Sequence, residues 1–64
     1  MENARFLRMS VVLQQSGLSR ATLYRKMADG TFPAQIHLGV RAVGWRVEDI
    51  EAWCNDPQGY RVDR

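Results

Sequence analysis

A short stretch of the chain, SGLSRATLYRKM from Ser16 to Met27, concentrates side chains that can bind an anionic partner. Its cations are Arg20, Arg25 and Lys26. The planar guanidinium of arginine can hold a phosphate, or the edge of a guanine, through two parallel hydrogen bonds, whereas lysine acts as a point charge. The pattern therefore favours contact with nucleic acid. A solvated cationic helix face is the alternative interpretation.

Signals at both ends of this stretch predict a helix over residues 20–29. Ser19 is a favourable N-cap, and Gly30 stands where a left-handed C-cap is common. An earlier helix is expected to begin with Ser10 as its N-cap and to run to about Ser16. Two short helices joined by a tight turn with a glycine are the outline of a helix-turn-helix. An ordinary antiparallel helical hairpin fits the same outline.

The helical period separates this second helix into two faces. Leu23 and Met27 share an apolar stripe, and Ala21 and Arg25 lie opposite it. A small alanine permits close approach to a groove, and an arginine beside it can read a guanine edge. The remaining polar side chains suit phosphates or a thymine methyl, and the amides behind the N-cap suit a phosphate. From this segment we expect DNA contacts by Ser19, Arg20, Ala21, Thr22, Tyr24, Arg25 and Lys26.

The next segment predicts a small β-hairpin beside the two helices. Alternation over Gln35–Leu38 indicates one strand, Gly39–Ala42 a turn and Val43–Trp45 the returning strand. Such a hairpin is a wing, with Arg41 near its tip and Arg46 at its exit. Both arginines are predicted DNA contacts. A structural ion pair is the competing role for Arg41.

The last predicted element is a helix from Val47 that closes the core with Trp45 and Trp53. Asn55 to Arg64 includes Pro57 and Gly59 and is expected to be a flexible tail, in which disorder is favoured over DNA contact by its arginines. The fold class is thus α+β, mainly α, a small winged helix-turn-helix. Its expected parts are an N-terminal arm or short strand (1–9), the winged domain (10–54) and the tail (55–64).

Charge is distributed unevenly along the chain. Residues 1–46 hold seven basic and two acidic side chains, a net charge of +5, whereas residues 47–64 hold two basic and five acidic ones, a net charge of −3. This asymmetry favours a basic working face and an acidic segment turned away from the partner. A chance fluctuation in a small protein is the alternative.

Other classes of function find little support in the sequence. With 64 residues there is room for one small domain, and His37 and Cys54 are its only histidine and cysteine. One of each cannot supply the four ligands of a zinc site, and no glycine-rich phosphate loop is present. No apolar run is long enough to span a membrane. We expect a cytoplasmic protein that is not an enzyme and that needs no cofactor or metal.

The spaced motifs together resemble the AlpA family of small phage-associated DNA-binding regulators, which are similar in architecture to the heads of MerR-type regulators and to excisionases. The resemblance covers about residues 5–54 and rests on five motifs: GLSRATLYR at 17–25, GTFP at 30–33, LG at 38–39, RAVGW at 41–45 and IEAW at 50–53. It implies that Ser19–Arg25 belongs to the recognition helix and Gly39–Ala42 to the wing.

The resemblance further implies double-stranded DNA as partner, and a role as activator or repressor of prophage genes or as a directionality factor for excision. Because no long helix follows the winged domain, side-by-side binding of monomers on repeated sites is the expected assembly. The alternative function is a protein-interaction module whose winged fold binds an integrase, an RNA polymerase or another regulator. Such binding would survive neutralisation of Arg20, Arg25 and Arg41.

Overall fold

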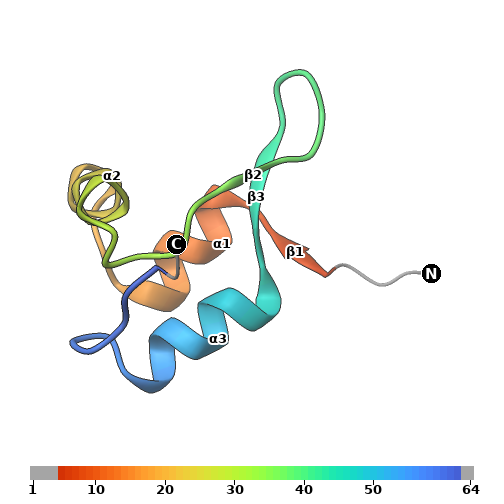
Figure 1. Ribbon diagram of the computed structural model, residues 1–64. Coiled ribbons are helices and arrows are strands. Elements are labelled where there is room, and N and C mark those ends of the chain that lie inside the picture. The colour runs from red at the N-terminus through yellow and green to blue at the C-terminus, as the bar shows by residue number, and fades with distance from the viewer. Residues whose placement is uncertain (1–4, 63–64) are drawn as a thin grey trace.

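The computed structural model describes residues 5–62 and contains three helices and three short strands (Figure 1). This confirms the predicted α+β, mainly helical class and is consistent with a small winged helix-turn-helix. In chain order the elements are β1 (Phe6–Leu7), α1 (Met9–Ser16), α2 (Arg20–Asp29), β2 (Ile36–His37), β3 (Val43–Arg46) and α3 (Val47–Asn55).

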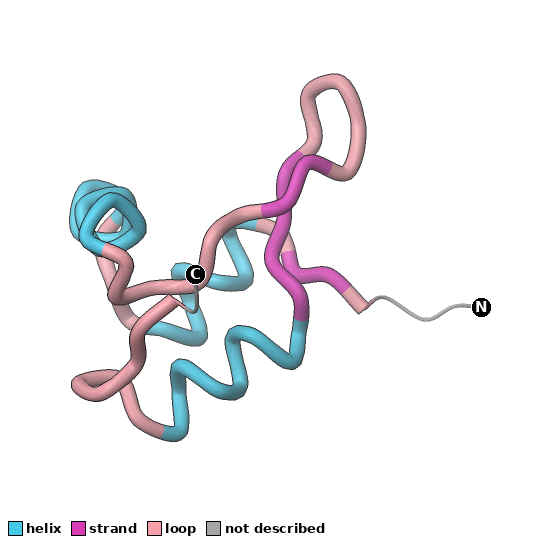
Figure 2. Tube along the Cα trace, in the orientation of Figure 1, coloured by secondary structure: helices cyan, strands magenta, loops and turns pink. Residues whose placement is uncertain are grey.

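The strands form one antiparallel sheet in the order β1-β3-β2. Phe6 lies opposite Arg46, and Ile36 lies opposite Gly44. Since successive side chains of a strand point to opposite faces, the buried Trp45 faces the helices and Arg46 faces away from them. Figure 2 shows that β2 and β3 continue into a long loop that stands clear of the helical body.

The core lies between the helices and the inner face of β3. Trp45 is fully buried and Trp53 is 6% exposed, which confirms the prediction that both tryptophans are core residues. Around them pack partly buried side chains, including Leu18 and Met27 from the stretch between Ser16 and Met27. Within residues 5–62 the buried members of the core cluster are Val12, Leu23, Phe32, Trp45, Ile50 and Trp53, and Pro33 is fully buried as well.

The predicted N-cap of the first helix is wrong. α1 begins at Met9, its N-cap is Arg8, and Ser10 lies exposed inside the first turn. The first helical hydrogen bond runs from the Val12 N–H to the Arg8 carbonyl, at 2.9 Å. Because β1 is paired with β3 and leads directly through Arg8 into the helix, the sheet fixes where α1 starts, and a serine cap is not needed.

Other element boundaries agree with the sequence to within a residue or two. α2 has the predicted limits, and α3 begins at Val47 directly after β3. The first strand of the hairpin is one residue shorter than expected at each end, because β2 spans only Ile36–His37 and leaves out Gln35 and Leu38. Residues 1–4 and 63–64 of the predicted arm and tail lie outside the described residues, and the flexibility of residues 55–64 stays a prediction.

Candidate nucleic-acid interface

Both ends of α2 are fixed by local hydrogen bonds. The Ser19 hydroxyl oxygen accepts the Thr22 N–H at 3.2 Å, and the Ser19 hydroxyl donates to Thr22 Oγ1 at 2.9 Å. At the other end Gly30 has φ of 78°, and its N–H donates to carbonyls of the last turn. Only a residue that tolerates positive φ can close the helix in this way, which explains the glycine. Ser19 therefore serves first as a structural cap.

The side chains of α2 divide as the helical period predicts. Leu23 is the single buried residue of the helix, and Met27 is half-buried beside it. Ala21 and Arg25 are exposed on the opposite face, and Tyr24 is 44% exposed. Arg20 is exposed at the N-terminal end, whereas Thr22 and Lys26 are half-buried. The small side chain of Ala21 is therefore exposed between the long cationic side chains of Arg20 and Arg25.

Two tryptophans attach the end of α2 to the rest of the molecule. The indole N–H of Trp45 donates to the Pro33 carbonyl at 2.8 Å, and that of Trp53 donates to the Thr31 carbonyl at 3.2 Å. Phe32 lies between them, with ring centroids 6.3 Å from Trp45 and 5.0 Å from Trp53, both in edge-on geometry. The loop after α2 is therefore bound to β3 and to α3, which holds the exposed helix face at a fixed orientation.

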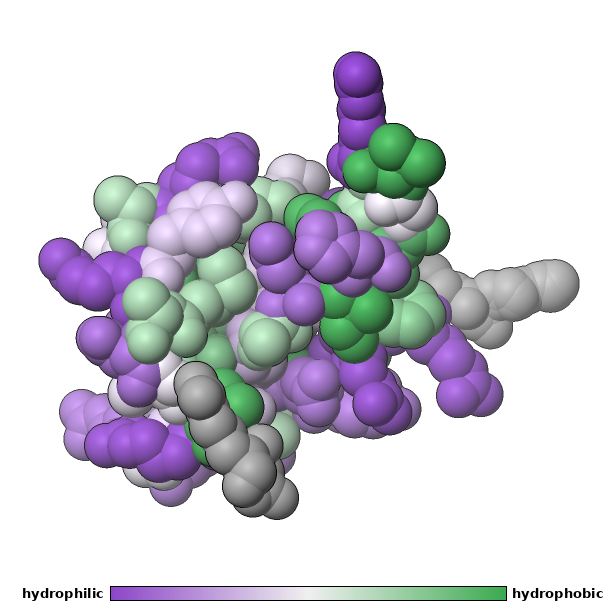
Figure 3. Space-filling model, turned by 45° about the horizontal axis from the view of Figure 1, so that its top comes forward, coloured by the Kyte–Doolittle hydropathy of each residue, from purple (hydrophilic) through white to green (hydrophobic). Residues whose placement is uncertain are grey.

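The hairpin tip forms the second exposed feature. The N–H groups of Leu38 and Gly39 both donate to the Ala42 carbonyl, at 2.8 and 3.3 Å, which closes the turn. Val40 is fully exposed and Arg41 is exposed beside it. Figure 3 shows hydrophilic and apolar side chains side by side on this projecting tip.

Arg41 lines a depression of about 570 Å³ together with Arg8 and the start of α1. Arg8 is a cation that the sequence analysis did not single out. The sequence predicts Ser10 as the N-cap, so it does not place Arg8 at the helix start. The proximity of Arg8 to the hairpin depends on how β1 pairs with β3.

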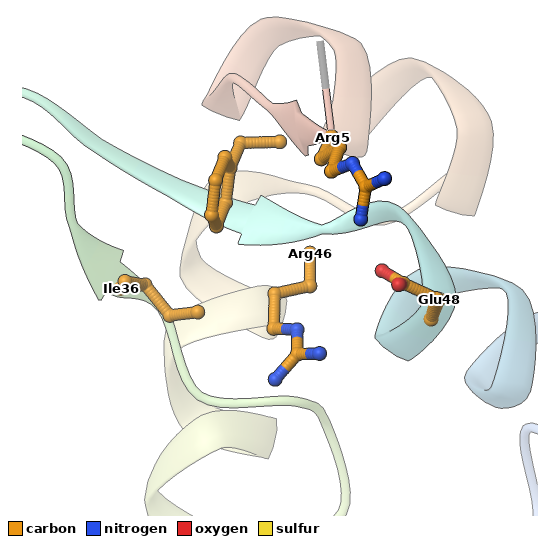
Figure 4. Close-up of a pocket in the computed structure, with 5 residues that line it drawn as sticks. Arg5, Ile36, Arg46 and Glu48 are labelled. Atoms are coloured by element: carbon orange, nitrogen blue, oxygen red, sulfur yellow. The ribbon is translucent and has the colours of Figure 1, made fainter. Parts of the chain in front are cut away.

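Arg46 lies in a different place from the α2 arginines. It is exposed on the outer face of the sheet and lines a depression of about 270 Å³ with Arg5, Phe6, Ile36 and Glu48 (Figure 4). The strand alternation that buries Trp45 turns Arg46 outward. The structure thus brings together the predicted contacts on α2, sets Arg41 on the hairpin, and places Arg46 beside another arginine and a carboxylate.

A cation from outside α2 lies beside two of the helix's own cations. Arg25 and Lys26 line a depression of about 400 Å³ that is also lined by Arg61. From the sequence, disorder is the favoured expectation for that arginine. The turn signals at Pro57 and Gly59 could have indicated a reversal of the chain, although not where it leads.

Comparison with known proteins gives a consistent result. The family model for the prophage CP4-57 regulatory protein AlpA matches residues 5–58. The chain belongs to the AlpA family. It is 40% identical over 57 residues to the DNA-binding transcriptional activator AlpA of Escherichia coli strain K12, a match covering 80% of this chain and 81% of that protein. A family of regulatory proteins confirms the expectation that the chain is not an enzyme.

A second relative of this AlpA-family chain comes from a phage. The uncharacterized protein ORF88 of Enterobacteria phage P4 is 43% identical over 49 residues. That match covers 77% of this chain and 56% of the phage protein, so the chain spans a little over half the length of this relative.

Within residues 5–62, no cluster of three or more potential ligands could hold a metal ion, and no helix is both long and apolar enough to cross a membrane. His37 and Cys54 are both exposed. Burial, and then the negative charge of Asp49, raise the pKa of Tyr60 above its usual 10.0.

Proposed function

We propose that this protein is a sequence-specific DNA-binding regulator that acts in the cytoplasm, where its DNA lies. The observation that carries the proposal is the outer face of α2, where Ala21 and Arg25 are exposed opposite the buried Leu23. An α-helix fits the major groove, and a small residue beside a long arginine lets the guanidinium reach a guanine edge. Membership of the AlpA family, and a relative named as a DNA-binding transcriptional activator, support this function.

Each predicted contact has a distinct role in this proposal. Arg25 reads a base, Arg20 and Lys26 hold backbone phosphates on either side, and Thr22 and Tyr24 supply a further phosphate or methyl contact. Ser19 caps the helix whose N-terminal amides face a phosphate. Arg41, on the hairpin, contacts the flanking DNA backbone or the minor groove. Arg46 is the weakest of the predicted contacts, because it lies with Arg5 and Glu48 on the outer face of the sheet.

The regulatory role of the protein depends on where its preferred DNA site lies. A promoter would make the protein an activator or repressor, and an attachment site would make it a directionality factor that assists an integrase. Side-by-side binding on repeated sites remains part of the proposal, because a single small domain covers only one short site.

The test is binding of the purified protein to fragments of its own genomic neighbourhood and to random DNA at several salt concentrations. We expect one fragment to be preferred and log K to fall linearly with log salt. Weak, equal binding to all fragments would contradict the proposal and would favour the protein-interaction alternative. In that case binding to an integrase or polymerase should survive neutralisation of Arg20, Arg25 and Arg41.

Two substitutions separate base reading from phosphate binding. Arg25→Ala should relax the preference at one position of the site by about 1–3 kcal/mol. Lys26→Ala should weaken binding to all sequences alike and reduce the salt slope by about 1. An equal loss on every sequence for Arg25→Ala would remove its base-reading role.

A further inference from the structure

The chain after α3 returns to the end of α2 along a defined path. Asp56 organises the turn: its carboxylate accepts the Gly59 N–H at 3.1 Å, and its carbonyl accepts the Tyr60 N–H at 2.9 Å. Tyr60 then packs against the core, and the Val62 N–H donates to the Gly30 carbonyl at 2.8 Å. The chain beyond the turn therefore returns to the end of α2, and Figure 1 shows it approaching the loop that follows this helix.

A basic depression lies between this turn and α2. We call it the C-terminal basic pocket. It has a volume of about 400 Å³, and three of its lining residues are cations against one carboxylate. It is lined by Arg25, Lys26, Asp29, Thr31, Pro57, Gln58 and Arg61.

The guanidinium of Arg61 is held in place by the turn itself. Its Nη1 donates to the Tyr60 carbonyl at 2.7 Å and to the Gln58 carbonyl at 3.3 Å. Both bonds use Nη1, so within the described residues the Nε and Nη2 groups keep their hydrogens for an external acceptor. A pre-oriented guanidinium edge suits an oxygen anion and loses less side-chain entropy on binding than a mobile arginine.

We propose that the C-terminal basic pocket binds a backbone phosphate of the DNA, a contact that rests on the function proposed above. Lys26 lies about 100° around the helix from Arg25, so a ligand between Lys26 and Arg61 sits beside the base-reading face and not on it. This is where the wall of the major groove must pass when α2 lies in the groove. Asp29 also lines the pocket, so its three cations and one carboxylate leave a net positive charge for an anion.

The C-terminal basic pocket and the hairpin lie at separate places on the molecule. In Figure 1 the hairpin and the C-terminal turn lie at opposite ends of the molecule, and α2 lies on the same side as the turn. The two features share no lining residue: Arg41 and Arg8 line one depression, and Arg61 lines the other. The protein thus holds the backbone at two separate places, and α2 is fixed in position relative to both.

The test compares Arg61→Gln with Arg5→Gln in the full chain. Both residues are exposed arginines, and both changes remove one positive charge, but Arg5 lies at the outer face of the sheet. Binding to the preferred fragment and to random DNA is measured between 50 and 200 mM salt. We expect Arg61→Gln to weaken binding to both DNAs by the same factor and to reduce the salt slope by about 1. Over this range the wild-type protein then loses about three- to fourfold more affinity than the variant.

A double variant tests whether Lys26 and Arg61 hold the same phosphate. If they do, Lys26→Ala combined with Arg61→Gln should weaken binding less than the product of the two single effects. Thermal unfolding of each variant checks that the fold is retained, which we expect because Arg61 is exposed.

The outcomes distinguish this inference from the proposed function. If the wild-type protein shows neither sequence preference nor salt dependence, the proposed function itself fails. If it shows both, and Arg61→Gln has the same salt slope as Arg5→Gln, only the phosphate pocket is overturned. A loss confined to the preferred fragment would also overturn it, since a phosphate contact carries no direct sequence information.

Discussion

At the scale of single residues, the two serines near helix starts have different roles. The Ser19 hydroxyl accepts the Thr22 N–H, whereas Ser10 lies inside the first turn of α1 and does not cap it. Ser19→Ala should therefore lower the free energy of unfolding by about 1 kcal/mol, the usual cost of losing an N-cap. The measurement is urea unfolding followed by circular dichroism.

Ser10→Ala is the matched control for this prediction. Alanine has the higher helix propensity, so this variant should be as stable as the wild type or slightly more stable. A loss at Ser10 as large as that at Ser19 would contradict the assignment of the two caps.

Gly44 is a second residue whose small size has a specific reason. A Cβ atom placed there would come within 2.9 Å of the Leu7 carbonyl oxygen and 2.9 Å of Leu38 Cδ1. The leucine tip can move, but the backbone oxygen belongs to the paired strand β1. Gly44→Ala should therefore cost about 1–3 kcal/mol of stability, as overpacking usually does.

The control for Gly44 is another glycine of the same hairpin. At Gly39 the nearest atom to an added Cβ is Ala42 Cβ at 3.9 Å, which is ordinary contact. Thermal unfolding of Gly39→Ala should stay within about 0.5 kcal/mol of the wild type. Equal losses at both glycines would show that the close approach of β1 is not the cause.

At the scale of elements, the loop after α2 depends on the two indole donors. Trp45→Phe removes the donor to the buried Pro33 carbonyl and leaves a void beside Phe32, so it should destabilise the protein by about 2–4 kcal/mol. Trp53→Phe should cost less, because its bond is longer, at 3.2 Å, and only partly buried. Urea unfolding of both variants gives the comparison, and the reverse order would contradict it.

The elements also show what the sequence could predict. α2 and α3 were placed correctly because caps, glycines and apolar spacing are local signals. The start of α1 was misplaced because the pairing of β1 with β3 determines it, and that pairing joins residues about forty positions apart.

The same distinction applies to the candidate site. The exposed face of α2 follows from its helical period, and the outward orientation of Arg46 could have been deduced from the burial of Trp45 next to it. The location of Arg61 could not, since it depends on the bond between Val62 and Gly30 at the far end of the returning chain.

At the scale of the whole molecule, the C-terminal segment closes the structure through Tyr60. Burial and then Asp49 raise the pKa of its phenol, so the folded state keeps the proton more tightly than the unfolded state. The stabilisation is fully present below pH 10, and it is lost as the pH rises through the raised pKa. The stability of the wild-type protein should therefore fall above pH 10.

Tyr60→Phe removes this titration and is the matched variant. Its unfolding free energy should fall less steeply than that of the wild type between pH 9 and pH 11, measured by urea unfolding at each pH. Parallel curves for the two proteins would show that the Tyr60 phenol does not couple the segment to the fold.

The small part that α2 plays in the core has a consequence for evolution. Of its ten residues only Leu23 is buried, and the helix is held at its ends by Ser19, Gly30 and the loop bound to the tryptophans. Substitutions at Ala21, Tyr24 or Arg25 leave these anchors untouched. If α2 reads DNA as proposed, a lineage of such proteins can therefore exchange its operator for another by changing a few surface positions, and each intermediate along the way still folds.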